Sequence, residues 1–180
     1  MANSKTYIIL LRGVMPTGKN RVPMAALREV LADAGYENVR TYIASGNALV
    51  DSGKSAREIE KHVHDLIKKH IGPELTVVVR TGAELQKVLD NNPFTNKYDL
   101  SRVFFTLFAL APTPSVVKEL TAQDFGDEEI VITKHAAYLY LPGNAARSKL
   151  TNAYLERKLS VTMTARNFNT ITKLIELSQN

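Results

Sequence analysis

The sequence predicts an α+β fold of two subdomains. The first is a ferredoxin-like βαββαβ unit, and the second is a smaller α+β unit with βαββα order plus a C-terminal helix. The chain has 180 residues, which is enough for one domain or two small ones. Short apolar runs alternate with segments of helical periodicity, and this order partly recurs in the second half without a visible residue-level repeat.

The first three elements are a strand, a long loop and a helix. Residues 6–11 form a short apolar run that predicts a buried strand, and polar residues follow as far as Arg21. A helix comes next, because Pro23 stands at its first turn and Gly35 just past its end. Apolar side chains recur between them at helical spacing: Met24, Leu27, Val30, Leu31 and Ala34.

A hairpin and a second helix complete most of the first motif. Residues 39–44 and 48–51 are rich in β-forming residues, and the turn-forming sequence Ser45-Gly46-Asn47 joins them. Residues 55–71 have amphipathic periodicity that ends at Gly72-Pro73. Residues 75–79 are then an apolar strand, which gives the split βαβ order.

The boundary between the subdomains is predicted from a short helix and the polar stretch after it. Residues 81–84 have the capping-box spacing, and the helix they introduce ends near Asn91-Asn92-Pro93. The sequence therefore predicts subdomains at 1–92 and 102–180, with 93–101 as the linker.

The second half repeats much of this order. Residues 103–110 predict a strand and 114–120 a short helix, and 129–133 with 137–141 predict a second hairpin. Residues 148–159 predict the next helix. The last strand of the motif is missing or reduced to 161–163, and a terminal helix with Ile171, Leu174 and Ile175 follows.

Composition excludes several chemistries. The chain has no cysteine, which excludes disulfides, thiolate nucleophiles and Cys-type zinc sites and fits a reducing compartment. No apolar run is long enough for a signal peptide or a membrane span, so we expect a cytoplasmic protein without membrane partners. His62, His64 and His70 share a helix but no pair is four residues apart, and we expect neither a metal nor a cofactor.

The formal net charge of +5 is unevenly distributed. Residues 1–28 contain five cations and no acid, and residues 134–173 contain seven cations and one acid, Glu156. If the two segments meet in the fold, they form a positive surface that attracts phosphate or carboxylate groups. If they do not meet, these side chains are ordinary solvated cations.

The loop from Arg12 to Asn20 is the first candidate for anion binding, through Arg12 and Lys19. Glycines and cations between a strand and a helix are typical of anion-binding loops. The loop is not a Walker A motif, because Asn20 replaces the required hydroxyl and the helix begins three residues too late, at Pro23. The alternative is a surface loop whose glycines make turns.

Two further candidates lie in the first half. Ser45 and Asn47 place a hydroxyl and an amide at the tip of the predicted hairpin, where they either bind a ligand or only make the turn. Arg80 leaves an apolar strand, and a cation in that position needs a carboxylate or a ligand near it.

The C-terminal candidates are Lys149, Arg166 and Asn167, which stand before predicted helices. Ser148 and Asn169 are natural N-caps, capping is also an alternative role for Asn167, and helix N-termini favour negative charge. Arg166 at the positive end of a helix is electrostatically disfavoured unless an anion compensates it.

Seven motifs, in order along the chain, resemble those of the family called domain of unknown function 1697, small cytoplasmic proteins found mainly in bacteria. They are Arg12-Gly13 with Gly18-Lys19-Asn20; Pro23-Met24 and Leu27; Thr41-Tyr42-Ile43-Ala44-Ser45-Gly46-Asn47; Val79-Arg80-Thr81; Asn92-Pro93-Phe94; Ser148-Lys149-Leu150; and Thr164-Ala165-Arg166-Asn167-Phe168-Asn169-Thr170. The resemblance implies two α+β subdomains of ferredoxin-like character and lends no activity. Two departures are Val14-Met15-Pro16-Thr17, where Ile-Asn-Val-Gly is usual, and Phe168, where Trp is usual.

We therefore expect a pocket for a phosphate-bearing or other anionic, nucleotide-like ligand in a basic cleft between the subdomains. Its residues are Arg12, Lys19, Ser45, Asn47, Arg80, Lys149, Arg166 and Asn167. Three alternatives remain open: a nucleic-acid binding module, an enzyme acting on a small phosphorylated substrate, and a purely structural role for these residues. The ligand, any reaction and the oligomeric state are left open.

Overall fold

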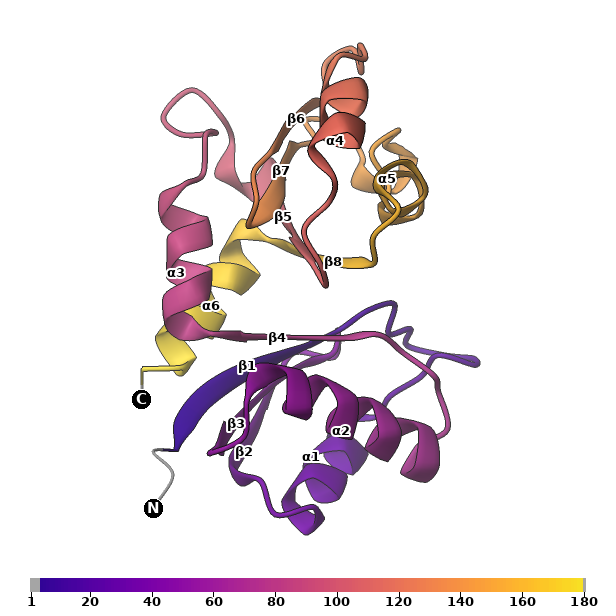
Figure 1. The fold of residues 1–180 in the computed structure, drawn as a ribbon, viewed down its shortest axis with the longest axis vertical. Coiled ribbons are helices and arrows are strands. Elements are labelled where there is room, and N and C mark those ends of the chain that lie inside the picture. The colour runs from indigo at the N-terminus through magenta and orange to yellow at the C-terminus, as the bar shows by residue number, and fades with distance from the viewer. Residues whose placement is uncertain (1–3, 180) are drawn as a thin grey trace. The chain divides into compact units, whose positions relative to one another are not determined.

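The computed structural model describes residues 4–179 and shows an α+β protein built from two halves, each with its own four-stranded antiparallel sheet (Figure 1). Within the described residues, one compact unit comprises 4–85 and 174–179 and the other comprises 86–173. The division between the two units falls inside two helices, at residues 85–86 and 173–174. The subdomains at 1–92 and 102–180 with a linker at 93–101 stay a prediction from the sequence.

The first half has the order predicted for a ferredoxin-like unit. Its elements are β1 (Lys5–Leu11), α1 (Met24–Asp33), β2 (Glu37–Tyr42), β3 (Asn47–Ser52), α2 (Ala56–His70) and β4 (Val77–Thr81). The strand order is β2-β3-β1-β4, and every neighbouring pair is antiparallel. The sheet order and the helix positions together match the split βαβ topology.

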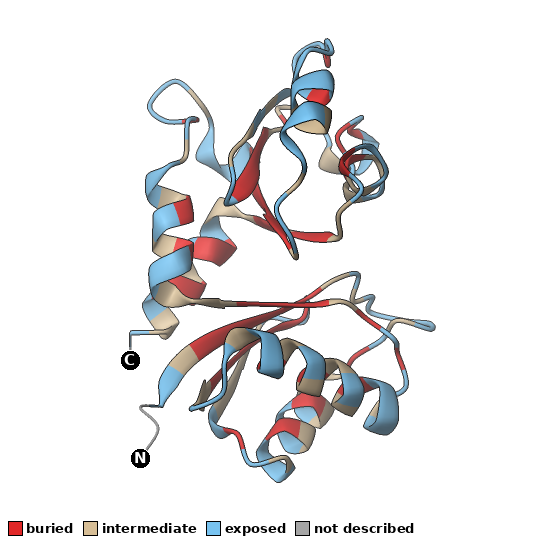
Figure 2. Ribbon diagram, viewed as in Figure 1, coloured by how far each residue is buried: buried red, intermediate tan, exposed pale blue. Residues whose placement is uncertain are grey.

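Strand alternation divides the first sheet into two buried faces. Ile9 pairs with Ala48 on one side and Val79 on the other, and all three join the core beneath α1 and α2. The opposite face is also buried, with Ile8 and Leu10 fully inaccessible to solvent. Figure 2 shows this burial along the strands.

Helix α3 (Gly82–Asp90) begins at a capping box. The Glu84 carboxylate accepts hydrogen bonds from the backbone N–H and the hydroxyl of Thr81, and the Thr81 hydroxyl accepts from the Glu84 N–H. After the helix, the Asn92 side chain accepts from the N–H of Phe94 and donates to its carbonyl. Phe94 is buried, so the Asn-Pro-Phe motif holds a turn and an aromatic anchor.

The second half has the same strand order as the first. Its elements are a 3₁₀ turn (Leu100–Arg102), β5 (Val103–Phe108), α4 (Pro114–Thr121), β6 (Glu129–Ile132), β7 (Ala136–Tyr140), a 3₁₀ turn (Ala145–Arg147), α5 (Asn152–Leu159), β8 (Met163–Asn167) and α6 (Phe168–Leu177). The sheet order β6-β7-β5-β8 corresponds to β2-β3-β1-β4. The second half is therefore a complete βαββαβ unit followed by α6.

The prediction that the last strand is missing or reduced to 161–163 is wrong. Strand β8 runs from Met163 to Asn167 and pairs with β5 from Phe108 to Phe104. Residues 164–167 are largely polar, so they lack the alternation that marks a strand locally. The strand exists because a distant segment, β5, supplies its hydrogen-bonding partner.

Two predicted helix caps are also wrong. Helix α5 begins at Asn152 with Thr151 as its N-cap, and Ser148 instead donates its hydroxyl to Glu128. The cap of α6 is Asn167 rather than Asn169, because the side-chain oxygen Oδ1 of Asn167 accepts from the Thr170 N–H at 2.9 Å. Capping residues are abundant in both segments, and the sequence alone does not show which of them begins the helix.

Candidate functional site

The loop between β1 and α1 is folded by its own backbone. The Met15 N–H donates to Asn20 O, the Arg21 N–H donates to Gly18 O, and the Arg12 N–H donates to Thr76 O at 3.0 Å. Gly18 has φ +80°, a left-handed conformation that residues with a Cβ adopt only with strain. The predicted loop is therefore a defined turn that presents Lys19 to solvent.

The β2–β3 turn packs directly beneath this loop. Gly46 has φ +85°, and a Cβ there would lie 2.7 Å from Val14 Cγ2 and 2.9 Å from Leu11 Cβ. The Leu11 N–H also donates to Gly46 O at 2.8 Å. Glycine is required at this position for two independent reasons, its conformation and the space it leaves.

Ser45 and Asn47 hold that turn together. Asn47 is fully buried, and its amide donates to Tyr42 O at 3.1 Å and to the Ser45 hydroxyl at 3.0 Å. The amide hydrogens of Asn47 are thus used within the hairpin, which supports the structural alternative for this residue. Ser45 is exposed.

Arg80 has the internal carboxylate partner that its sequence position leaves open. Its Nη1 lies 3.8 Å from Glu60 Oε1 and donates to Val79 O at 2.7 Å. The same Glu60 oxygen accepts from the Val79 N–H at 2.9 Å. Glu60 therefore both pairs with a backbone N–H of the edge strand β4 and offsets the positive charge of Arg80.

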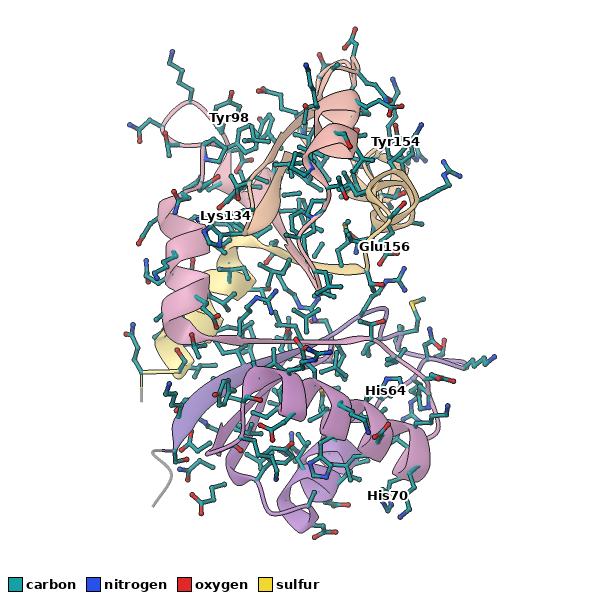
Figure 3. All side chains as sticks on the ribbon, viewed as in Figure 1. His64, His70, Tyr98, Lys134, Tyr154 and Glu156 are labelled. Carbon is teal, nitrogen blue, oxygen red and sulfur yellow. The ribbon has the colours of Figure 1, made fainter. Side chains whose placement is uncertain are left out.

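A cavity of about 410 Å³ opens between the β1–α1 loop, the start of α1 and the end of α2. It is lined by Gly18, Lys19, Arg21, Pro23, Ala26, His70, Ile71, Gly72 and Pro73. Three of these side chains are basic or can be protonated, and none of the nine is acidic. Figure 3 labels His70 at the end of α2. We call this space the loop–helix cavity.

The start of α1 gives the loop–helix cavity a positive backbone. Pro23 occupies the N-cap position without a side-chain cap, and the first turn contains no acid. The first bond of the helix runs from the Leu27 N–H to Pro23 O, so the preceding N–H groups have no partner within the helix. Glu74, which follows the lining residue Pro73 in the chain, has its carboxylate paired with the Lys68 ammonium at 2.9 Å. Unsatisfied N–H groups and nearby cations are the features that bind anions at helix starts.

The second half holds the other three predicted residues. Lys149 is exposed, and its backbone N–H donates to Glu128 Oε2 at 3.1 Å. Arg166 is buried, and its Nη1 donates to Thr164 Oγ1 and Ala165 O, both at 2.8 Å. Desolvation by burial lowers the pKa of Arg166 to about 10, so this guanidinium remains charged at neutral pH. Asn167 caps α6.

Of the predicted set, Lys19 lines the loop–helix cavity, and Ser45 and Asn47 contact each other in the β2–β3 turn. Arg12, Lys19, Ser45, Asn47 and Arg80 belong to the first unit and Lys149, Arg166 and Asn167 to the second, and a common cleft remains a prediction. Lys19 is joined in the loop–helix cavity by Arg21 and His70, which sequence reasoning did not select. The only sequence feature that points to Arg21 is its place in the acid-free segment 1–28. No sequence feature points to His70 as a binding residue.

No group of three His, Asp or Glu side chains in the described part of the chain is placed to hold a metal ion. Among residues 4–179, no helix is both long and apolar enough to cross a bilayer.

Comparison with known proteins identifies a family of unknown function and a solved structure of similar fold. A family model described as "Protein of unknown function (DUF1697)" matches residues 4–138. No curated protein matches the chain significantly. The solved structure of a conserved bacterial protein, SP0830 from Streptococcus pneumoniae, has a TM-score of 0.76 and 24% sequence identity, and the alignment covers 97% of this chain and 99% of that one. At this identity the likeness shows the fold.

Proposed function

Because the chain belongs to the DUF1697 family, whose function is unknown, we propose from its own geometry that it binds a phosphate-bearing or other anionic ligand in the loop–helix cavity. One observation carries the proposal: Lys19, Arg21, His70 and the uncapped start of α1 border the same cavity, and no acid lines it. The predicted role of Lys19 is retained, and Arg21 and His70 are added to it.

The energetics favour a ligand larger than a bare anion. A hydrogen bond to a charged group contributes about 1.5–3 kcal/mol, whereas association costs roughly 4–15 kcal/mol. Three such bonds only just offset that cost, so useful affinity needs further contacts. A volume of about 410 Å³ lies within the range of roughly 300–1,000 Å³ that is typical of small-molecule pockets, which fits a nucleotide-like ligand.

The geometry supports binding more directly than the two other functional alternatives. Sheet-face RNA recognition needs exposed aromatic rings, whereas the central positions on the face of the first sheet opposite α1 and α2, which are Ile8, Leu10 and Leu49, are fully buried aliphatic residues. Catalysis would need a general base and an oriented nucleophile, and the lining holds one imidazole and no carboxylate. The proposal therefore stops at binding.

Calorimetric titration with adenosine diphosphate tests this proposal. Replacing Lys19→Ala together with Arg21→Ala should weaken binding at least tenfold, because two charge-assisted hydrogen bonds are lost. Lys61→Ala is the matched control, since this lysine lies on α2 with its side chain 82% exposed and outside the cavity. Circular dichroism checks that each variant is folded.

Two outcomes would contradict the proposal. One is an affinity unchanged by the double substitution, and the other is an equal loss with Lys61→Ala. A single-stranded oligonucleotide tested at 50 and 200 mM salt examines the nucleic-acid alternative. Tight binding that falls about 10³-fold or more over this range would indicate multiple phosphate contacts and favour a nucleic-acid surface.

A further inference from the structure

A second, larger concavity lies in the other half of the molecule. Its volume is about 610 Å³, and it lies between the loop after β5, helix α4 and the end of the edge strand β6. Its lining residues are Ala111, Pro112, Pro114, Val117, Lys118, Thr121, Ile132, Thr133 and Lys134. We call it the α4–β6 groove. It shares no residue with the loop–helix cavity.

The walls of the groove are apolar and preformed. Val117 and Ile132 are partly buried and pack against the core of the second half, which fixes the floor. The turn after β6 is held by the Thr133 hydroxyl, which accepts from the N–H groups of His135 and Ala136. Pro112 and Pro114 restrict the backbone of the opposite wall. A preformed apolar wall reduces the ordering cost of binding.

The loop that lines one wall of the groove also carries an exposed leucine. Leu110 precedes the first lining residue and is 77% exposed, the highest value among the large hydrophobic side chains of the described chain. Single exposed leucines are common on protein surfaces. Because Leu110 adjoins the lining residue Ala111 in the chain, it adds exposed apolar surface to the loop that forms one wall of the groove.

The charge of the groove has one sign. Lys118 and Lys134 are its charged lining residues, both are exposed, and none of the nine residues is acidic. Figure 3 labels Lys134 at the turn between β6 and β7. Lysine stems lie along apolar surface while their ammonium groups remain in water. The groove thus combines an apolar body with two cationic rim groups.

We propose that the α4–β6 groove binds an amphiphilic anion, a molecule with an apolar chain and one carboxylate or phosphate head. The apolar lining residues contact the chain of the ligand. Lys118 and Lys134 bind its head, because their positive ammonium groups complement a negative carboxylate or phosphate. We favour a free amphiphile over a membrane surface, because the groove is a concavity of about 610 Å³, which lies within the size range of small-molecule pockets.

Titration of the intact protein with decanoate, below the concentration at which it forms micelles, tests the proposal. Wild-type protein should bind decanoate more tightly than decanol, and decyl phosphate shows which head is preferred. The double substitution Lys118→Gln with Lys134→Gln should weaken decanoate binding at least tenfold and leave the affinity for decanol unchanged. Lys97→Gln, an exposed lysine of the same half outside the groove, should change neither.

Several results would overturn this assignment. They are equal affinities for decanoate and decanol, an undiminished affinity in the double variant, and no decanoate binding by the wild type. Binding only to vesicles that contain phosphatidylglycerol, without binding of free decanoate or decyl phosphate, would assign the surface to membranes instead. Both variants keep the apolar floor intact, and their amide spectra check the fold.

Discussion

Arg166 in the second half occupies the same structural position as Arg80 in the first. Arg80 pairs with Ile8 of the central strand β1, and Arg166 pairs with Phe105 of the corresponding strand β5. Each arginine donates Nη1 to the carbonyl of the residue before it, at 2.7 Å and 2.8 Å. Each is followed by the residue that caps the next helix. The two halves therefore repeat a strand–arginine–cap–helix element.

The environments of the two arginines differ, so replacing each by lysine should change the pH dependence of stability differently. Burial lowers the pKa of Arg166 to about 10, and the same burial should lower the pKa of a lysine amine below its usual 10.4. The folded Arg166→Lys variant then binds fewer protons than its unfolded form, so its stability rises with pH up to about 10.4. Urea unfolding from pH 7 to pH 10 measures this rise.

Arg80→Lys is the matched comparison for that experiment. The Arg80 side chain is 22% exposed and lies beside Glu60. The stability of Arg80→Lys relative to wild type should therefore stay constant over this pH range. Parallel pH curves for Arg166→Lys and wild type would show that desolvation does not govern this site.

Asn47→Ala should destabilise the protein by about 1–3 kcal/mol. Asn47 is fully buried, and the substitution removes the amide that donates to the Tyr42 carbonyl and to the Ser45 hydroxyl. Ser45→Ala removes one exposed acceptor and keeps the bond to Tyr42, so it should cost at most about 1 kcal/mol. Denaturant unfolding of both variants gives the difference, and equal losses would refute the bracing role of Asn47.

Gly46→Ala should cost more stability than Gly18→Ala. Both glycines have left-handed φ angles, so alanine adds about 1–2 kcal/mol of backbone strain at either site. Only at Gly46 does the new Cβ also meet Val14 and Leu11. Thermal unfolding ranks the two variants. Adding Val14→Ala should restore part of the Gly46→Ala loss, since the Leu11 Cβ still obstructs the site.

Tyr36→Phe should make the alkaline loss of stability less steep. Burial raises the pKa of Tyr36 to about 12, so between pH 10 and 12 the folded protein holds a proton that the unfolded chain releases. Stability from this group therefore falls as pH rises through this range, by on the order of 2 kcal/mol in total. Urea unfolding at pH 9, 10 and 11 compares the slopes, and identical slopes would contradict the assignment.

Local patterns predicted most of the fold, because most elements carry their own signal. The run at 6–11 and the periodicity of 55–71 correspond to β1 and α2 within one residue at either end. Strand β8 carries no such signal, because Thr164, Arg166 and Asn167 interrupt the apolar pattern. Its existence depends on hydrogen bonds to β5, which lies far away in the sequence.

The candidate site was predictable only where one segment contains it. The glycines and Lys19 of the β1–α1 loop indicated an anion site locally. His70 reaches the same cavity only because α1 and α2 pack side by side in the first half, so no local pattern indicates it. Conversely, Asn47 and Arg80 resemble ligand-binding residues in sequence, and their hydrogen bonds within the fold give each a structural role.

The central claim is that the loop–helix cavity binds a phosphate-bearing anion, and amide chemical shifts test it most directly. In a titration with adenosine diphosphate, the N–H signals of Gly18, Lys19 and Met24 to Ala26 should shift together and saturate with a single dissociation constant. Shifts centred instead on Lys149, Arg166 and Asn167, or no saturable shift anywhere, would contradict the claim.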